Sequence, residues 1–323
     1  MKKMEYYKLG GIMTVNWILI LSIIIVALII LIIYIGKKMC DIAIKSDIAK
    51  KYSKLIFTPE QKNAMDKTSD ENIRWLEKNS KEVEIISKDG LKLKGYEVTN
   101  NNSNIWVIAV HGYLGRASDM VKHTQKFIEF GYNVLILDLR AHGKSEGKYI
   151  GMGWLDHYDL ELWIEKIISD NKNSKIILYG ISMGAATVMM ATGGNLPSNV
   201  KVCIEDCGYT SAWEEFCMHI RRIFHMLPFP LLYVASMISK IHVGYGFKEA
   251  SSVKQVKKSK TPTLFIHGAC DKFVPFEMLE KIYKSARCPK EKLEIEDSAH
   301  AESSDVNPDK YWSGVKEFIN KYI

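Results

Sequence analysis

The chain has 323 residues, of which 47% are hydrophobic and 25% are charged, and its formal net charge is +7. This composition is ordinary for a globular protein, and it excludes disorder, collagen or a coiled coil as the main architecture. The basic residues are spread along the chain without a recognition motif, so we expect no nucleic-acid partner.

Residues 17–35 predict a transmembrane helix. They read WILILSIIIVALIILIIYI, carry no charge, and place Trp17 and Tyr34 near the two ends. As a helix this segment is roughly 28 Å long, close to the thickness of the hydrocarbon core of a bilayer. The following residues Gly36-Lys37-Lys38 make a poor signal-peptidase site, which favours a retained anchor over a cleaved signal peptide.

We therefore expect residues 1–38 to form an N-terminal anchor that contacts the lipid bilayer through residues 17–35. The chain would be a single-pass protein of the cell membrane. Lysines are nearly balanced on the two sides of the span, so charge barely signals the orientation. By analogy with signal anchors, we expect the rest of the chain to be extracytoplasmic.

Residues 39–81 are polar and rich in lysine, with apolar residues at helical spacing, and predict a juxtamembrane helix and connector. Residues 82–323 predict one α/β domain. A hairpin over 82–98 precedes short apolar runs that alternate with longer amphipathic stretches. This pattern predicts a mostly parallel sheet of about eight strands with helices on both faces. The short apolar runs that follow the hairpin cover residues 105–110, 133–137, 175–179, 201–204, 263–266 and 292–295.

Ligands bind at the carboxyl ends of strands in such sheets. Directly after the run 175–179 stands Gly-Ile-Ser-Met-Gly, a G-x-S-x-G motif centred on Ser182. Residues 143–147 match the same pattern around Ser145, but that serine lies beyond its strand and lacks a following helix pattern. A nucleophile elbow needs a strand before the serine and a helix after it, so we predict Ser182 as the nucleophile.

A serine hydroxyl needs a base to take its proton. His300 follows the last predicted strand and comes after the serine and the candidate aspartates, the expected chain order. We predict His300 as the base. His111, His142 and His267 stand near strand ends beside or close to glycine, and we expect them to form hydrogen-bonded turns.

The third member of the group must be a carboxylate that orients the imidazole. Asp271 follows the strand 263–266 and is our first choice, with Asp206 after the preceding strand as the alternative. Asp138 is expected to brace its own turn through Arg140 or backbone N–H groups. The oxyanion needs two N–H donors, and we assign these to Met183, after the nucleophile, and to Tyr113, in the loop after the strand 105–110.

Five motifs in order resemble the α/β-hydrolase family, over about residues 82–323. They are His111-Gly112-Tyr113, Asp138-x-Arg140-x-His142-Gly143, Gly180-x-Ser182-x-Gly184, His267-Gly268-x-x-Asp271-x-x-Val274-Pro275 and Ala299-His300. Residues 208–216 and 247–260 are similar to a serine-hydrolase subgroup that includes bacterial membrane-anchored esterase-like proteins and lysophospholipase or monoacylglycerol-lipase-like members. The resemblance implies hydrolysis of an ester or thioester without a metal or an organic cofactor.

Residues 211–250 would then form a short helical lid. Ser211 and Glu214 have the spacing of a capping box. The lid also carries Met226, Leu227 and Phe229, which we predict to bind the substrate, although packing on the core is an equal alternative. None of the six cysteines forms a CxxC pair, and no metal site is predicted.

The sequence therefore predicts a membrane-anchored serine hydrolase that cleaves a small-molecule carboxylic ester through a Ser-His-Asp triad and an acyl-enzyme. A serine peptidase or thioesterase of the same fold is one alternative. A non-catalytic module that binds a partner at the membrane is the other. Neither the substrate nor the oligomeric state follows from the sequence.

Overall fold

The fold is that of a computed structural model, which describes residues 2–55, 69–100 and 103–323. Its centre is a sheet of eight strands in the order β1-β2-β4-β3-β5-β6-β7-β8. Strand β2 is antiparallel to both of its neighbours, and the other pairs are parallel. The strands are β1 (Lys81–Ile86), β2 (Lys92–Val98), β3 (Ile105–Val110), β4 (Asn133–Leu137), β5 (Lys175–Ile181), β6 (Val200–Asp206), β7 (Thr263–Gly268) and β8 (Lys290–Ile295).

Helices cover both faces of the sheet because the central strands are apolar on both sides. In β3, Ile108 and Val110 pack in the cluster that contains α6 (Asp156–Asp170) and α7 (Met183–Thr192). Val107 and Ala109 pack in the opposite cluster with α5 (Val121–Glu129) and α13 (Pro308–Tyr322). The predicted, mostly parallel sheet with helices on both faces is therefore present, with the hairpin at one edge.

Shorter elements complete the chain. They are α2 (Ser46–Lys51), η1 (Ser53–Leu55), α4 (Ser69–Asn79), η2 (Ala117–Met120), α10 (Ser252–Val256), α11 (Phe276–Ser285) and α12 (Ser303–Val306). Two further helices, α8 (Ala212–Phe224) and α9 (Leu231–Val243), lie in the segment predicted to form a lid.

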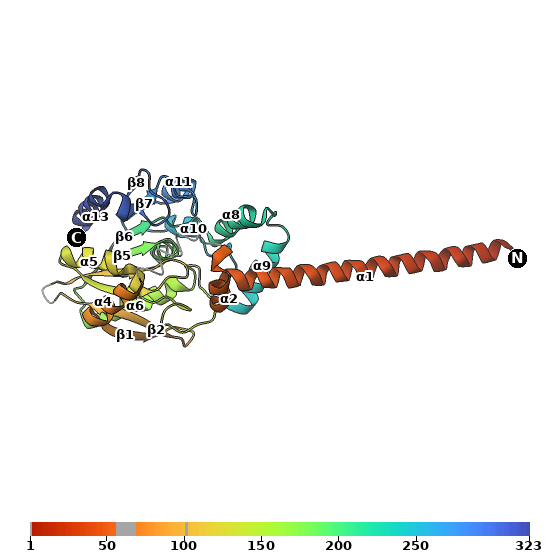
Figure 1. The fold of residues 1–323 in the computed structure, drawn as a ribbon, viewed down its shortest axis with the longest axis horizontal. Helices are drawn as coiled ribbons and strands as arrows, with labels where there is room; N and C mark the ends of the chain where they lie inside the picture. The colour runs from red at the N-terminus through yellow and green to blue at the C-terminus, as the bar shows by residue number, and fades with distance from the viewer. Residues whose placement is uncertain (1, 56–68, 101–102) are drawn as a thin grey trace.

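The N-terminal helix α1 (Lys2–Ile44) projects away from the globular part (Figure 1). Within it, residues 16–44 are long and apolar enough to cross a membrane. The helix does not break at residue 38, where the sequence placed the end of the anchor. It continues to Ile44, because Cys40 and Ile44 are buried in the core of the globular part. Part of the predicted connector, residues 56–68, lies outside the described residues.

The end of α1 packs against the lid helix α9, and the two helices are in close contact at Gly36. A Cβ atom on Gly36 would lie 2.6 Å from Cγ1 of Val234. Any larger residue at this position would therefore push the two helices apart.

Candidate active site

Ser182 lies on the tight turn between β5 and α7, with φ 56° and ψ −115°. The flanking glycines are required by close backbone contacts. A Cβ atom on Gly180 would lie 2.3 Å from the carbonyl oxygen of Gly184, and one on Gly184 would lie 2.1 Å from that of Val110. This is the geometry of a nucleophile elbow. The rival Ser145 instead donates a hydrogen bond to the backbone carbonyl of Asp138.

Three side chains from distant parts of the sequence form one hydrogen-bonded chain. Nε2 of His300 lies 2.9 Å from Oγ of Ser182, and Nδ1 of His300 lies 2.7 Å from Oδ2 of Asp271. The other carboxylate oxygen of Asp271 accepts from the N–H groups of Phe273 and Val274. With Asp271 ionised, Nδ1–H donates to it and Nε2 is free to accept the serine proton.

The two candidate acids have different partners and different proton affinities. Burial alone would raise the pKa of Asp271, but hydrogen bonds from His267 and His300 outweigh it and hold this pKa below its ordinary value. Asp206 accepts a hydrogen bond from Tyr311 Oη at 2.9 Å, and burial raises its pKa to about 6. The structure therefore brings Asp271, and not Asp206, into contact with His300.

His267 contributes to this site in a way that the sequence did not indicate. Its Nε2 lies 2.8 Å from the carbonyl oxygen of Val274 and 3.3 Å from Oδ2 of Asp271. The expected role as a turn former is confirmed by the first contact. The second contact depends on how the loop after β7 folds back, which no spacing in the sequence reveals.

Tyr113 and Met183 lie on two segments that meet at Ser182. A Cβ atom on Gly112 would lie 3.3 Å from Cβ of Ser182, so the loop after β3 runs directly beside this serine. Met183 is the first residue of α7, and the N–H groups of a first helical turn have no partner within the helix. Within the described residues, no backbone hydrogen bond leaves the N–H of Tyr113.

Two buried histidines shape the loop that carries Tyr113. Nε2 of His142 accepts from the N–H of Leu114, and Nε2 of His111 accepts from the N–H of Leu139. Burial lowers the pKa of both histidines, to about 3 for His142, so both act as neutral acceptors. This agrees with the turn-forming role predicted for them. Asp138 braces the same region by accepting from backbone N–H groups, also as predicted.

An open cavity has Ser182 in its wall. Its wall is almost wholly apolar. The lining side chains include Phe216, Ile220 and Ile223 of α8, Leu232 and Ala235 of α9, and Met39, Ile42 and Ala43 of α1. Ser182 is thus part of the wall of a mostly apolar cavity, a form that suits the binding of an apolar group.

Known proteins share the fold and part of the sequence of this chain. Residues 101–215 match the family model described as serine aminopeptidase, S33. The uncharacterized protein YqkD of Bacillus subtilis is 30% identical over 237 residues, which cover 73% of this chain and 78% of YqkD. The uncharacterized membrane protein YNL320W of Saccharomyces cerevisiae is 25% identical, over 73% of this chain and 78% of that protein. The esterase Pf2001 of Pyrococcus furiosus superimposes with a TM-score of 0.61 at 26% identity, over 75% of this chain and 92% of that chain.

The chain belongs to the α/β-hydrolase family. The family and the fold class predicted from the strand-end motifs are thereby confirmed. The comparisons identify a hydrolase of esterase or peptidase type, without separating the two.

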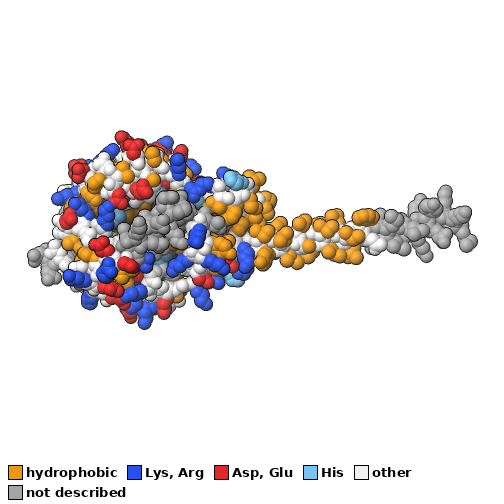
Figure 2. All heavy atoms as spheres, in the orientation of Figure 1, with side chains coloured by type: hydrophobic (Ala, Val, Ile, Leu, Met, Phe, Trp, Pro, Cys, Tyr) orange, Lys and Arg blue, Asp and Glu red, His pale blue; other side chains and the backbone are white. Residues whose placement is uncertain are grey.

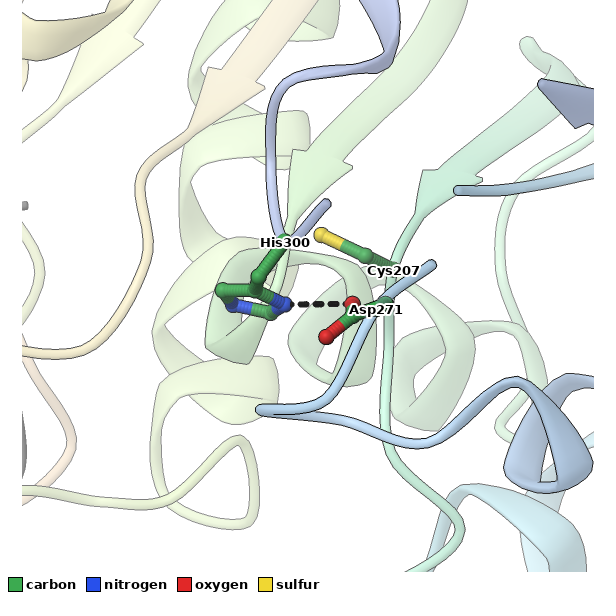
Figure 3. Close-up of side chains that lie close together, drawn as sticks. All are labelled: Cys207, Asp271 and His300. Carbon is green, nitrogen blue, oxygen red and sulfur yellow. Dashed lines mark hydrogen bonds and ion pairs between the residues drawn. The ribbon is translucent and has the colours of Figure 1, made fainter. Parts of the chain in front are cut away.

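In this α/β hydrolase a buried thiol lies beside the hydrogen-bonded chain. Ligand atoms of Cys207, Asp271 and His300 all lie within 4.8 Å of one another (Figure 3). Burial raises the pKa of the Cys207 thiol well above its usual range, so the thiol stays protonated. Both nitrogens of His300 already have hydrogen-bond partners. We therefore assign no metal to this group.

The predicted substrate-binding residues of the lid need a correction. Met226, Leu227 and Phe229 are not among the described residues that line the cavity, and they are 44%, 75% and 73% exposed. They lie in the loop between α8 and α9, which turns outward. The lid instead contributes the apolar side chains of its helices to the cavity wall.

The lid also brings one buried acid to the cavity. Glu215 lines it, and its Oε1 lies 2.7 Å from Nε2 of His219. Arg222 donates to Nδ1 of His219, which leaves the proton on Nε2 for the carboxylate. Oε2 of Glu215 has no hydrogen-bond partner within the described part of the chain.

Proposed function

We propose that this α/β hydrolase is a membrane-anchored serine hydrolase that cleaves carboxylic esters through an acyl-enzyme. The observation that carries the proposal is the chain of hydrogen bonds from Ser182 through His300 to Asp271 at the end of an apolar cavity. The likeness to the Pf2001 esterase supports the same reading.

In the proposed reaction each residue has one task. Oγ of Ser182 attacks the ester carbonyl carbon while Nε2 of His300 takes the hydroxyl proton. The carbonyl oxygen becomes an oxyanion, which the N–H groups of Met183 and Tyr113 stabilise. His300 then returns the proton to the leaving alcohol as the C–O bond breaks. Water adds to the acyl-enzyme by the same sequence and releases the carboxylic acid and Ser182.

The test is hydrolysis of p-nitrophenyl butyrate by the full chain in detergent, with Ser182→Ala compared with Ser145→Ala. Both serines sit in G-x-S-x-G motifs, so the pair forms a matched control. We expect Ser182→Ala to reduce kcat by several orders of magnitude and Ser145→Ala to change it less than tenfold. Undiminished turnover by Ser182→Ala would remove this serine from the mechanism. An inactive but folded wild type would favour the non-catalytic binding module.

A peptidase is the second candidate, and Glu215 favours it. The matched family model is described as a serine aminopeptidase, and a buried carboxylate at the cavity suits a substrate ammonium group. The discriminating pair is a p-nitrophenyl ester against an aminoacyl p-nitroanilide. The ester proposal expects the ester to be preferred, and Glu215→Gln to leave that preference in place. A loss of anilide hydrolysis in Glu215→Gln would support the peptidase.

We further propose that residues 17–35 cross the bilayer, with the hydrolase domain outside the cytoplasm. The support is the apolar surface of α1, whose side chains from Trp17 to Leu31 are about half exposed or more. A surface of this kind suits lipid contact. The relative YNL320W is named as a membrane protein.

A further inference from the structure

The membrane helix and the catalytic cavity share a wall. Met39, Ile42 and Ala43, from the last turns of α1, line the same cavity as Ser182. The carbonyl oxygen of Ala43 accepts a hydrogen bond from Oη of Tyr113, at 2.9 Å. Tyr113 is on the loop that supplies the proposed oxyanion donor, so the end of α1 is bonded to the catalytic site itself.

The cavity begins close to the end of the apolar span. From Ile35 to Met39 the helix advances about 6 Å. Between them lie Lys37, which pairs with Asp41, and Lys38, whose Nζ lies 5.6 Å from the ring centre of Tyr34. Lysine and tyrosine in this arrangement are typical of the headgroup region. The cavity would therefore lie at the level where the ester groups of lipids are found.

The lid presents an apolar surface beside the span. Leu227, Phe229 and Ile241 are each more than 70% exposed. Figure 2 shows the apolar surface of the lid lying next to that of α1. The close contact of α1 with α9 at Gly36 holds the lid at this height. Large exposed apolar patches mark contact with a protein or a membrane, and continuity with the span favours the membrane.

We propose that the substrate is an acyl ester lipid of the bilayer, whose acyl chain enters between lid helix α8 and α1, past Phe224, and lies against Met39 and Ile42. This inference rests on the ester hydrolysis and the membrane span proposed above. Inside the cavity such a chain would contact the apolar side chains of α8 and of the end of α1, so its burial there would remove apolar surface from water. The anchor thereby acts as part of the substrate site as well as a tether.

The experiment uses the full chain reconstituted in phosphatidylcholine–phosphatidylglycerol vesicles. Two probes are compared, monooleoylglycerol in the vesicles and water-soluble p-nitrophenyl acetate. Ile42→Trp fills the cavity from the side of α1, whereas Ile30→Trp places the same ring on the exposed, lipid-facing part of the helix. The readout is the ratio of kcat/KM for the long-chain probe to that for acetate.

We expect Ile42→Trp to lower this ratio at least tenfold and Ile30→Trp to leave it unchanged. An unchanged ratio in a folded Ile42→Trp would overturn the inference. The double variant Leu227→Asp/Phe229→Asp should lower monooleoylglycerol turnover at least fivefold, and full turnover would count against entry beside the lid. No acetate hydrolysis by the wild type would instead be a failure of the proposed function.

A second measurement does not depend on a cavity mutation. Oleoylglycerol with a diazirine in its acyl chain is bound to Ser182→Ala in the same vesicles and irradiated. We expect cross-links to residues 39–43. Cross-links confined to the span or to other surfaces would show that the chain does not lie along this wall.

Discussion

At the residue scale, burial and hydrogen bonding compete to set the pKa of each buried acid. Burial raises the pKa of Glu205 to about 8 and that of Asp156 to about 7. Asp271 is also buried, but two imidazoles and two backbone N–H groups face its oxygens. Asp271 therefore keeps its charge, and that charge can orient and stabilise the imidazole of His300.

The first prediction concerns Asp271→Asn. The amide cannot accept from Nδ1–H as a charged group and favours the wrong imidazole tautomer, so kcat for p-nitrophenyl butyrate should fall by on the order of 10³–10⁴-fold. Asp206→Asn serves as the control, since that acid bonds to Tyr311. This substitution should lower kcat for the same substrate less than tenfold. Equal losses in the two variants would mean that Asp271 has no special role.

The second prediction concerns Glu205→Gln and pH. An ordinary glutamate has a pKa of about 4.3, so between about pH 4 and pH 8 the unfolded chain loses a proton that folded Glu205 retains. The stability of the wild type therefore falls as pH rises through this window. Glutamine carries no such proton. The Tm of Glu205→Gln minus the Tm of the wild type should increase from pH 5 to pH 8, as measured by thermal unfolding. For the exposed control Glu296→Gln, the Tm difference from the wild type should not increase over this pH range.

The strand-end rule allowed Ser182, His300 and Asp271 to be chosen from the sequence, because parallel strands bring their following residues to one edge. The contact of His267 with Asp271 could not be chosen in this way. It depends on the path of the loop 269–274, and loop paths are set by tertiary packing. For the same reason the outward turn of Met226, Leu227 and Phe229 was missed.

At the element scale, α1 and α9 act as a pair. The sequence predicts both helices from their apolar content, but it does not indicate that one packs on the other. A glycine inside a long apolar helix is a weak signal of a close helix contact, and Gly36 is that signal here. Met39 and Ile42 line the cavity because of this contact, so their position could not be predicted from the sequence either.

The third prediction concerns Gly36→Leu. Leucine is a better helix former than glycine, so α1 itself should be unharmed. Its side chain would meet Val234, and the lid should separate from α1. Trypsin cleavage after Arg221 or Arg222 should then be several-fold faster. Ala27→Leu, on the exposed part of the span, is the control and should leave cleavage unchanged. Equal rates of trypsin cleavage in the two variants would contradict the packing described here.

At the scale of the whole molecule, the long apolar helix and the hydrolase domain form one continuous structure. The helix α1 runs without a break from the span into the core of the domain. With residues 17–35 in the bilayer, as proposed, this continuous helix would hold the domain close to the membrane at a fixed height. The sequence predicted the span and the domain as separate units, because composition changes at residue 38 while the helix does not.

The fourth prediction concerns the side of the membrane. Of the six cysteines, Cys270 is the exposed one, and Cys217 is half-buried. A membrane-impermeant maleimide should label Cys270 in intact cells if the domain is extracytoplasmic. Cys270→Ser should abolish most of this labelling. Labelling that appears only after the membrane is permeabilised would place the domain in the cytoplasm.

The central claim is that Ser182 is the nucleophile of a working relay. A fluorophosphonate reacts covalently with an activated serine, and mass spectrometry of the digested full-length protein locates the adduct. The account predicts an adduct on the peptide that contains Ser182, and its loss in His300→Ala. An adduct on another serine, or none on a folded and soluble preparation, would contradict it.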